Sequence, residues 1–126
     1  MSAWTGDELA AFAAAEEVHI APRRRDGTLR NPVTVWVVRI GDDLYVRSVR
    51  GREGAWFGGI QETHSGQIRA GRVEKDVSFV DAGPDVVDEI DEAYRTKYRR
   101  YAGRILNSVL TPEARVATMR LSPLPT

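Results

Sequence analysis

Residues Val33–Ser48, with the sequence VTVWVVRIGDDLYVRS, carry the clearest structural signal in this chain. Their first half, 33–40, is rich in β-branched and aromatic residues, which fit a pleated sheet and crowd a helix. Gly41-Asp42-Asp43 has the composition of a turn, and 44–48 again has that of a strand. The stretch therefore predicts a β-hairpin with strands at 33–40 and 44–48.

Short runs with strand-like composition predict further strands on both sides of the hairpin. They cover 18–20, 67–70, 73–80 and 115–121. Pro22 ends the first run, and Gly71-Arg72 forms the turn between the second and the third. Together with the hairpin, these runs give about six strands.

A capping box predicts a helix near the N-terminus. The hydroxyl of Thr5 is placed to accept from the amide of Glu8, while the Glu8 side chain reaches back to Thr5. Leu9 and Phe12 then follow helical spacing, so we expect them to pack on the sheet.

A second, longer helix is predicted from about Val86 to Tyr101. Its acidic residues come first and its basic residues last, which complements the helix dipole. Asp91 and Arg95 have the spacing of a favourable ion pair within the helix. The apolar stripe consists of Val87, Ile90, Tyr94, Tyr98 and Tyr101.

This order of elements predicts an α+β fold. Antiparallel strands without a strand–helix–strand rhythm favour a barrel with helices packed outside it. A chain of 126 residues is long enough for one domain with its own core, so we expect a single domain over 1–126.

Composition excludes several classes of function. There is no cysteine, which excludes disulfides, thiolate metal sites and cysteine nucleophiles. The formal net charge is zero, which argues against nucleic-acid binding and favours a solvated loop for Arg23–Arg25. Neither a signal peptide nor an apolar run of ~20 residues is present, so we expect no membrane association and a cytoplasmic location.

Several motifs together resemble the bacterial domain-of-unknown-function family 2255. The resemblance extends from Trp4 to Pro123, and its more specific parts are Tyr45–Ser48 and the spaced residues Asp91, Ala93, Tyr94, Lys97 and Tyr98. The remaining motifs are Arg25–Thr28, Trp36–Leu44, Gly51 with Trp56, and Ala117, Thr118, Leu121 and Pro123.

The same pattern is similar to the flavin-binding split-barrel superfamily, in particular its deazaflavin-dependent nitroreductase-like branch. The resemblance implies a split β-barrel, often dimeric, with FMN or a deazaflavin in a groove beside the hairpin. A complete phosphate-binding signature of that branch is absent from the sequence.

The candidate cofactor site is built from arginines and tryptophan around the hairpin. Arg30, Arg47, Ser48 and Arg50 are expected to hold a phosphate, and Trp56 to cover a flat ring. Arg47 is expected at the barrel rim; the alternative is a solvent-side strand residue paired with an acid. Trp36 is expected in the core.

Other side chains suggest less chemistry. A tyrosine–lysine pair such as Tyr94 and Lys97 is suited to acid–base work, but such tyrosines more often pack in a core with their hydroxyls reaching the surface. His19 and His64 lie far apart and no set of ligands has metal-site spacing, so no metal is expected. No catalytic residue is assigned.

Two functions of different class remain open at this point. The first is a flavin- or deazaflavin-binding oxidoreductase-like protein, for which the resemblance implies a homodimer. The second is a cofactor-free barrel that binds a small ligand or a protein without enzymatic activity, which the incomplete phosphate signature favours.

Overall fold

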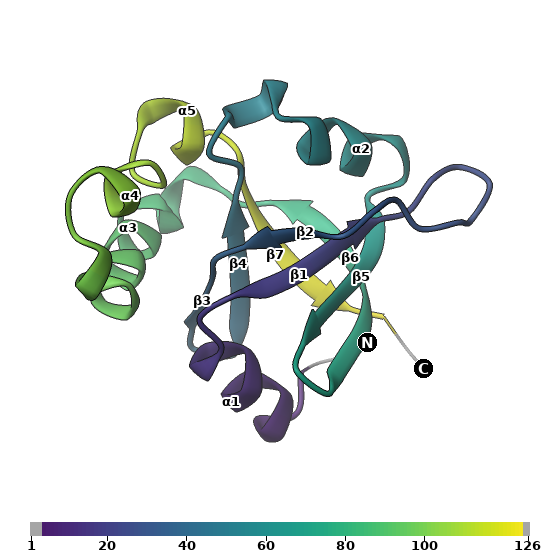
Figure 1. The fold of residues 1–126 in the computed structure, drawn as a ribbon, viewed down its shortest axis with the longest axis horizontal. Helices are drawn as coiled ribbons and strands as arrows, with labels where there is room; N and C mark the ends of the chain where they lie inside the picture. Colours follow the sequence, from purple (N-terminus) through teal and green to yellow (C-terminus); the bar gives the residue numbers. More distant parts are fainter. Residues whose placement is uncertain (1–3, 125–126) are drawn as a thin grey trace.

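The computed structural model describes residues 4–124, and within them the strands form one antiparallel sheet that curls into a nearly closed barrel (Figure 1). The strand order is β2-β1-β5-β6-β7-β4-β3. The strands are β1 (Val18–Pro22), β2 (Val33–Val35), β3 (Val37–Ile40), β4 (Asp43–Arg47), β5 (Ser65–Ala70), β6 (Val73–Asp81) and β7 (Thr118–Pro123).

The two edges of the sheet come from one continuous piece of chain. β2 pairs with β1, whereas β3 pairs with β4, and only Trp36 separates β2 from β3. The prediction of a single strand over 33–40 is therefore wrong. Local composition favours extended backbone throughout, but a curled sheet can pair the two halves of the run with different partners. The barrel is split at this bend.

Helices close both ends of the barrel. The helices are α1 (Gly6–Ala14), α2 (Ala55–Thr63), α3 (Val87–Lys97), α4 (Arg104–Asn107) and α5 (Pro112–Arg115), with 3₁₀ turns η1 (Gly51–Glu53), η2 (Pro84–Val86) and η3 (Arg99–Tyr101). Figure 1 shows α1 and α2 at opposite ends of the barrel. Leu9 and Phe12 of α1 and Phe57 and Ile60 of α2 are buried in the same core as the strands.

The N-terminal capping box is confirmed. The Glu8 amide donates to Thr5 Oγ1 at 3.1 Å, and the Thr5 amide donates to Glu8 Oε1 at 2.8 Å. Just before this cap, the indole of Trp4 is buried and donates to the carbonyl of Leu121 on β7 at 3.1 Å. The capping box therefore sets the start of α1, and the tertiary bond of Trp4 attaches this end of the helix to the barrel.

A second core lies outside the barrel, where α3 packs on β3 and β4. Ile90, Tyr94 and Tyr98 are buried there as the stripe predicts, together with Val38 and Tyr45. The helix is shorter than predicted, because it ends at Lys97 and Tyr101 lies in η3.

The segment 104–117 also differs from the prediction. It forms α4 and α5, and the last strand begins at Thr118 instead of 115. Thr111 caps α5 and Pro112 occupies its first turn, so a start signal for this helix was present in the sequence. Within residues 4–124, no helix has the length and apolarity needed to cross a membrane.

Candidate functional site

A cavity of about 420 Å³ opens where the barrel is split. Thr34 and Val35 of β2 and Trp36 at the bend line it, and so do Arg47 and Val49 at the end of β4. β3 pairs with β4 up to Val37 opposite Val46, whereas β2 turns away to β1. The cavity therefore occupies the place where β2 and β4 diverge.

Aromatic rings form much of the cavity wall. Trp36 stacks on Tyr98, the residue after α3, with 3.9 Å between ring centroids and 5° between ring planes. The ring centroid of Tyr101 lies 5.3 Å from that of Trp36. Trp56 of α2 also lines the cavity and contacts Phe57 edge to face at 6.3 Å. Trp36 and Trp56 are both half-buried. Trp36 is thus a wall of the cavity, and not only a core residue as predicted.

The far side of the cavity comes from the segment around α4. Ile105, Ser108 and Val109 line it, and Ile105 is 57% exposed. Val49, which follows β4 and also lines the cavity, is 49% exposed. Exposed aliphatic side chains at the mouth of a cavity are a feature of surfaces that bind a ligand or a partner.

Arg47 lies at this cavity, but its guanidinium is completely buried. It forms an ion pair with Asp91 of α3 and donates to the carbonyl of Val109 at 2.9 Å. It also donates to Thr118 Oγ1 at 2.8 Å and to the carbonyl of Val87 at 3.0 Å. The expected position at the rim is therefore wrong; Arg47 pairs with an acid, but inside the protein.

The predicted ion pair between Asp91 and Arg95 is also wrong. Arg95 pairs with Glu92 at 3.2 Å, and Asp91 faces the interior, where Arg115 approaches its second oxygen at 3.2 Å. The helical spacing would allow Asp91 to pair with Arg95. In the folded protein Asp91 pairs instead with the buried Arg47, whose charge needs a partner.

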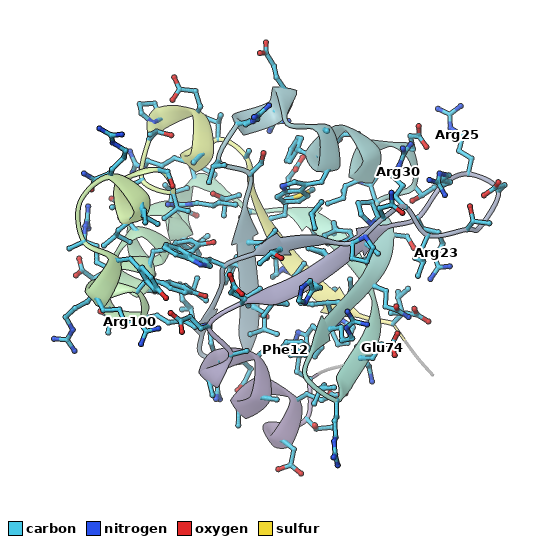
Figure 2. The ribbon with its side chains drawn as sticks, viewed as in Figure 1. Phe12, Arg23, Arg25, Arg30, Glu74 and Arg100 are labelled. Carbon is cyan, nitrogen blue, oxygen red and sulfur yellow. The ribbon has the colours of Figure 1, made fainter. Side chains whose placement is uncertain are left out.

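The other predicted phosphate-binding residues do not line the cavity. Arg30 forms an ion pair with Glu62 of α2 at 2.9 Å, and Figure 2 shows it near the loop that carries Arg25. The hydroxyl of Ser48 is buried without a hydrogen-bond partner and faces Gly54, where an added Cβ would lie 2.5 Å from it. Arg50 is exposed. Of the five candidates, the structure brings Arg47 and Trp56 together.

Tyr94 and Lys97 of α3, with Tyr98 just after it, hold the bend in place. Tyr94 donates to the carbonyl of Trp36 at 2.8 Å, and Tyr98 donates to that of Glu16 at 2.8 Å. Lys97 donates to the carbonyls of Phe12 and Val37. Both tyrosine hydroxyls are thus used in structural hydrogen bonds, which agrees with a packing role for these residues.

Burial changes the acidity of these groups. It raises the pKa of Tyr94 and of Tyr98 well above the ordinary value for a phenol. Burial also lowers the pKa of Lys97 to about 8. A phenol with a raised pKa is a poorer proton donor at neutral pH, so these tyrosines are better suited to packing than to acid catalysis.

The arginine run near the start of the chain forms a projecting loop. Arg23 donates to the carbonyl of Gly27 at 2.8 Å and pairs with Asp76 at 3.2 Å. Figure 2 shows Arg25 pointing outward from this loop. The prediction of a solvated loop is confirmed for Arg24 and Arg25, which are exposed. Among residues 4–124, no group of three His, Asp or Glu side chains is arranged to hold a metal ion.

Sequence reasoning missed the part of the cavity that comes from distant segments. Glu17, Ile105 and Ser108 line it, yet none of them belongs to a recognisable local motif, and Tyr101 was predicted only as part of the apolar stripe of the late helix. The segment around α4 takes its place at the cavity through tertiary contacts, such as the bond from Arg47 to Val109. No spacing in the sequence therefore connects this segment with Trp56.

A model of a family of uncharacterised proteins conserved in bacteria, DUF2255, matches residues 8–121. The chain belongs to this family. The match includes β1 to β6, β7 up to Leu121 and all residues of the cavity. No curated protein sequence matches this DUF2255 chain.

Solved structures of other proteins share the fold of this DUF2255 member. HutZ, a heme storage protein from Vibrio cholerae, has a TM-score of 0.63 at 12% identity, covering 96% of this chain and 91% of its own. An FAD-binding protein from Mesorhizobium loti has a TM-score of 0.61 at 13% identity, covering 98% and 93%. An F420 reductase has a TM-score of 0.53 at 16% identity, covering 92% of each chain. At these identities the likeness establishes the split-barrel fold.

Proposed function

We propose that this protein binds a flat aromatic cofactor of the flavin or deazaflavin type in the cavity of the split and acts as an oxidoreductase-like protein. The observation that carries the proposal is the pair of tryptophans, Trp36 and Trp56, which come from different elements and line one cavity. Indole rings offer flat apolar walls to a flat ring, and such walls are typical of cofactor pockets.

The size of the cavity agrees with this proposal. Pockets for small molecules measure roughly 300–1,000 Å³, and this one measures about 420 Å³. Val35 and Val109 are buried in its floor, while Val49 and Ile105 are exposed at its mouth. A bound ring would cover part of this apolar surface; a second copy of the chain would cover the rest, and we therefore propose a homodimer as well.

The proposed roles follow from the contacts. Trp56 covers the ring, as predicted from the sequence, and Trp36 with its stacked partner Tyr98 forms the second wall. Arg47 holds the cavity in shape through its bonds to Asp91 and Val109. The cofactor would supply the hydride chemistry, and the protein would supply the apolar groove and the orientation. The FAD-binding and F420 reductase structures of the same fold support this class of ligand.

A titration tests the proposal. The purified protein is titrated with FMN and then with a deazaflavin cofactor, following the anisotropy of the ligand's fluorescence. We expect saturable binding in the micromolar range that weakens about tenfold in Trp56→Ala, since an aromatic wall is worth on the order of 1 kcal/mol or more. Arg25→Ala, at the tip of the projecting loop, is the control and should bind as the native protein does.

One observation favours the second candidate, a cofactor-free barrel that binds another small ligand without enzymatic activity. The guanidinium at the cavity, that of Arg47, already donates four hydrogen bonds to protein acceptors. It offers little to a cofactor phosphate. Absence of saturable binding of both cofactors would contradict the oxidoreductase proposal and leave this candidate.

A further inference from the structure

The charges around the cavity restrict the chemistry of its ligand. We infer that the part of the ligand held in this cavity carries no negative charge and presents a hydrogen-bond donor, or a positive charge, to Glu17. This inference rests on the proposed function, because it concerns the same cavity and assumes that a flat ring binds there.

The first step concerns Arg47, the cation that lines the cavity. Its side chain is fully buried, and its four hydrogen bonds connect β4 with α3, β7 and the segment after α4. To hold a phosphate, the guanidinium would have to leave Asp91. That carboxylate is 10% exposed and would keep only Arg115 as a partner, at 3.2 Å. Uncovering a buried charge is costly, so Arg47 stays with Asp91 when a ligand binds.

The second step concerns the polar side chains that remain available. The hydroxyl of Tyr101 is engaged by Glu16 and Arg100, and that of Ser108 donates to the carbonyl of Ile105 at 2.6 Å. Glu17 and Thr34 also line the cavity and are exposed. Within residues 4–124, neither of these two side chains forms a hydrogen bond or an ion pair. The available polar side-chain groups are thus a carboxylate, a hydroxyl and the indole N–H donors of Trp36 and Trp56, and the carboxylate is the only charged one among them.

The third step concerns which ligand groups are complementary to Glu17. A carboxylate accepts hydrogen bonds and repels anions, and the repulsion is stronger beside apolar walls than in open water. A flavin-type ring satisfies this site because its pyrimidine edge carries an N–H donor. Its phosphate does not satisfy it. The cavity therefore favours the neutral ring over a phosphate, because the charge of Glu17 opposes a second negative charge inside it.

In an alternative binding mode, an exposed arginine close to the cavity would hold the phosphate of the ligand. Arg50 follows Val49 along the chain, and Arg104 precedes Ile105; both arginines are exposed. If either one held a phosphate, a phosphorylated ligand would bind more tightly than the same ring without a phosphate. The comparison of two such ligands separates the two arrangements.

The experiment uses riboflavin and FMN, which carry the same ring and differ by the phosphate. Dissociation constants for both are measured by isothermal titration with the native protein, with Glu17→Gln and with Glu74→Gln. Glu74 is an exposed acid on β6 that does not line the cavity, and Figure 2 shows it far from Arg100 and the α4 side of the barrel. Its substitution changes the net charge by the same amount and so controls for long-range electrostatics.

We expect native protein to bind riboflavin about threefold or more tighter than FMN. In Glu17→Gln this preference should fall to about one, while Glu74→Gln should retain it. Tighter binding of FMN, or a preference that Glu17→Gln leaves unchanged, would overturn the inference and keep the proposed function. Absence of binding of both ligands would contradict the proposed function, and this inference with it.

Discussion

The guanidinium of Arg47 on β4 and the carboxylate of Asp91 on α3 form a buried ion pair that joins the barrel to its outer helix. The two side chains are 0% and 10% exposed. Arg115 pairs with the other oxygen of Asp91 at 3.2 Å and also with Asp88 at 2.6 Å. Arg47 further binds the carbonyl of Val109, so the pair also fixes the segment that covers the cavity.

Removal of one member of this pair should strongly destabilise the protein. Arg47→Met or Asp91→Leu leaves a buried charge without its main partner, and the expected loss is about 3–5 kcal/mol in the free energy of unfolding. Urea denaturation of the variants measures it. The exposed pair Arg95 and Glu92 is the control, since Arg95→Ala should change stability by less than about 1 kcal/mol.

The double variant Arg47→Met with Asp91→Leu tests the reason for that loss. If the cost comes from the uncompensated charge, the double variant should lose less than the sum of the two single variants. Strictly additive losses would show instead that each side chain acts through its own packing.

Two glycines should respond to alanine in opposite directions. Gly58 is exposed inside α2, and an added Cβ would have nothing within 4 Å, so Gly58→Ala should stabilise by about 0.5–1 kcal/mol. A Cβ at Gly66 on β5 would lie 2.5 Å from the carbonyl oxygen of Ala21 on β1, so Gly66→Ala should destabilise by about 1–3 kcal/mol. Thermal unfolding of both variants checks this; equal effects would contradict a steric cost at the close approach of β1 and β5.

Tyr98 combines a ring stack with a hydrogen bond, and two substitutions separate them. Tyr98→Phe keeps the stack on Trp36 and loses the bond to the carbonyl of Glu16, at an expected cost of about 1 kcal/mol. Tyr98→Leu loses both and should cost at least about 2 kcal/mol. Because the stack supports a wall of the cavity, only Tyr98→Leu should also weaken FMN binding; an equal loss of affinity in both variants would contradict this division of roles.

Lys97 should make stability depend on pH in the alkaline range. Burial lowers its pKa from 10.5 to about 8, so between these values the unfolded chain binds a proton that the folded protein does not. The free energy of unfolding should therefore rise as the pH increases above about 8, and it should be insensitive to this group below that pH. Urea denaturation of native protein and Lys97→Met at about pH 7, 8 and 9 measures the effect, and the variant should lack the rise.

The buried tyrosines limit the pH range in which the effect of Lys97 can be measured. The raised pKa of Tyr94 and Tyr98 has the opposite sign, because the unfolded phenols lose their protons first and stability falls above about pH 10. Measurements between about pH 7 and 9 therefore isolate Lys97. The same rise in Lys97→Met as in native protein would assign it to another group.

Part of the candidate site was predictable from local sequence. Trp56 follows a glycine-flanked loop and begins a short helix, and it does line the cavity. Arg47 lies at the end of the predicted second strand of the hairpin, also at the cavity. The direction and burial of its side chain were not predictable, because they depend on Asp91, which is 44 positions away in the sequence.

The elements that could be predicted from the sequence are those whose causes are local. The turn at Gly41 and Asp42, the capping box of Thr5 and Glu8, and the apolar stripe of the late helix all depend on residues within a few positions of one another. Only the tertiary structure decided where the barrel splits, since Val33–Ile40 favours extended backbone throughout and the partners β1 and β4 divide it at Trp36. That division opens the cavity and brings Arg47 to Asp91. Neither could be predicted locally, because burial and pairing depend on segments that meet only when the sheet closes.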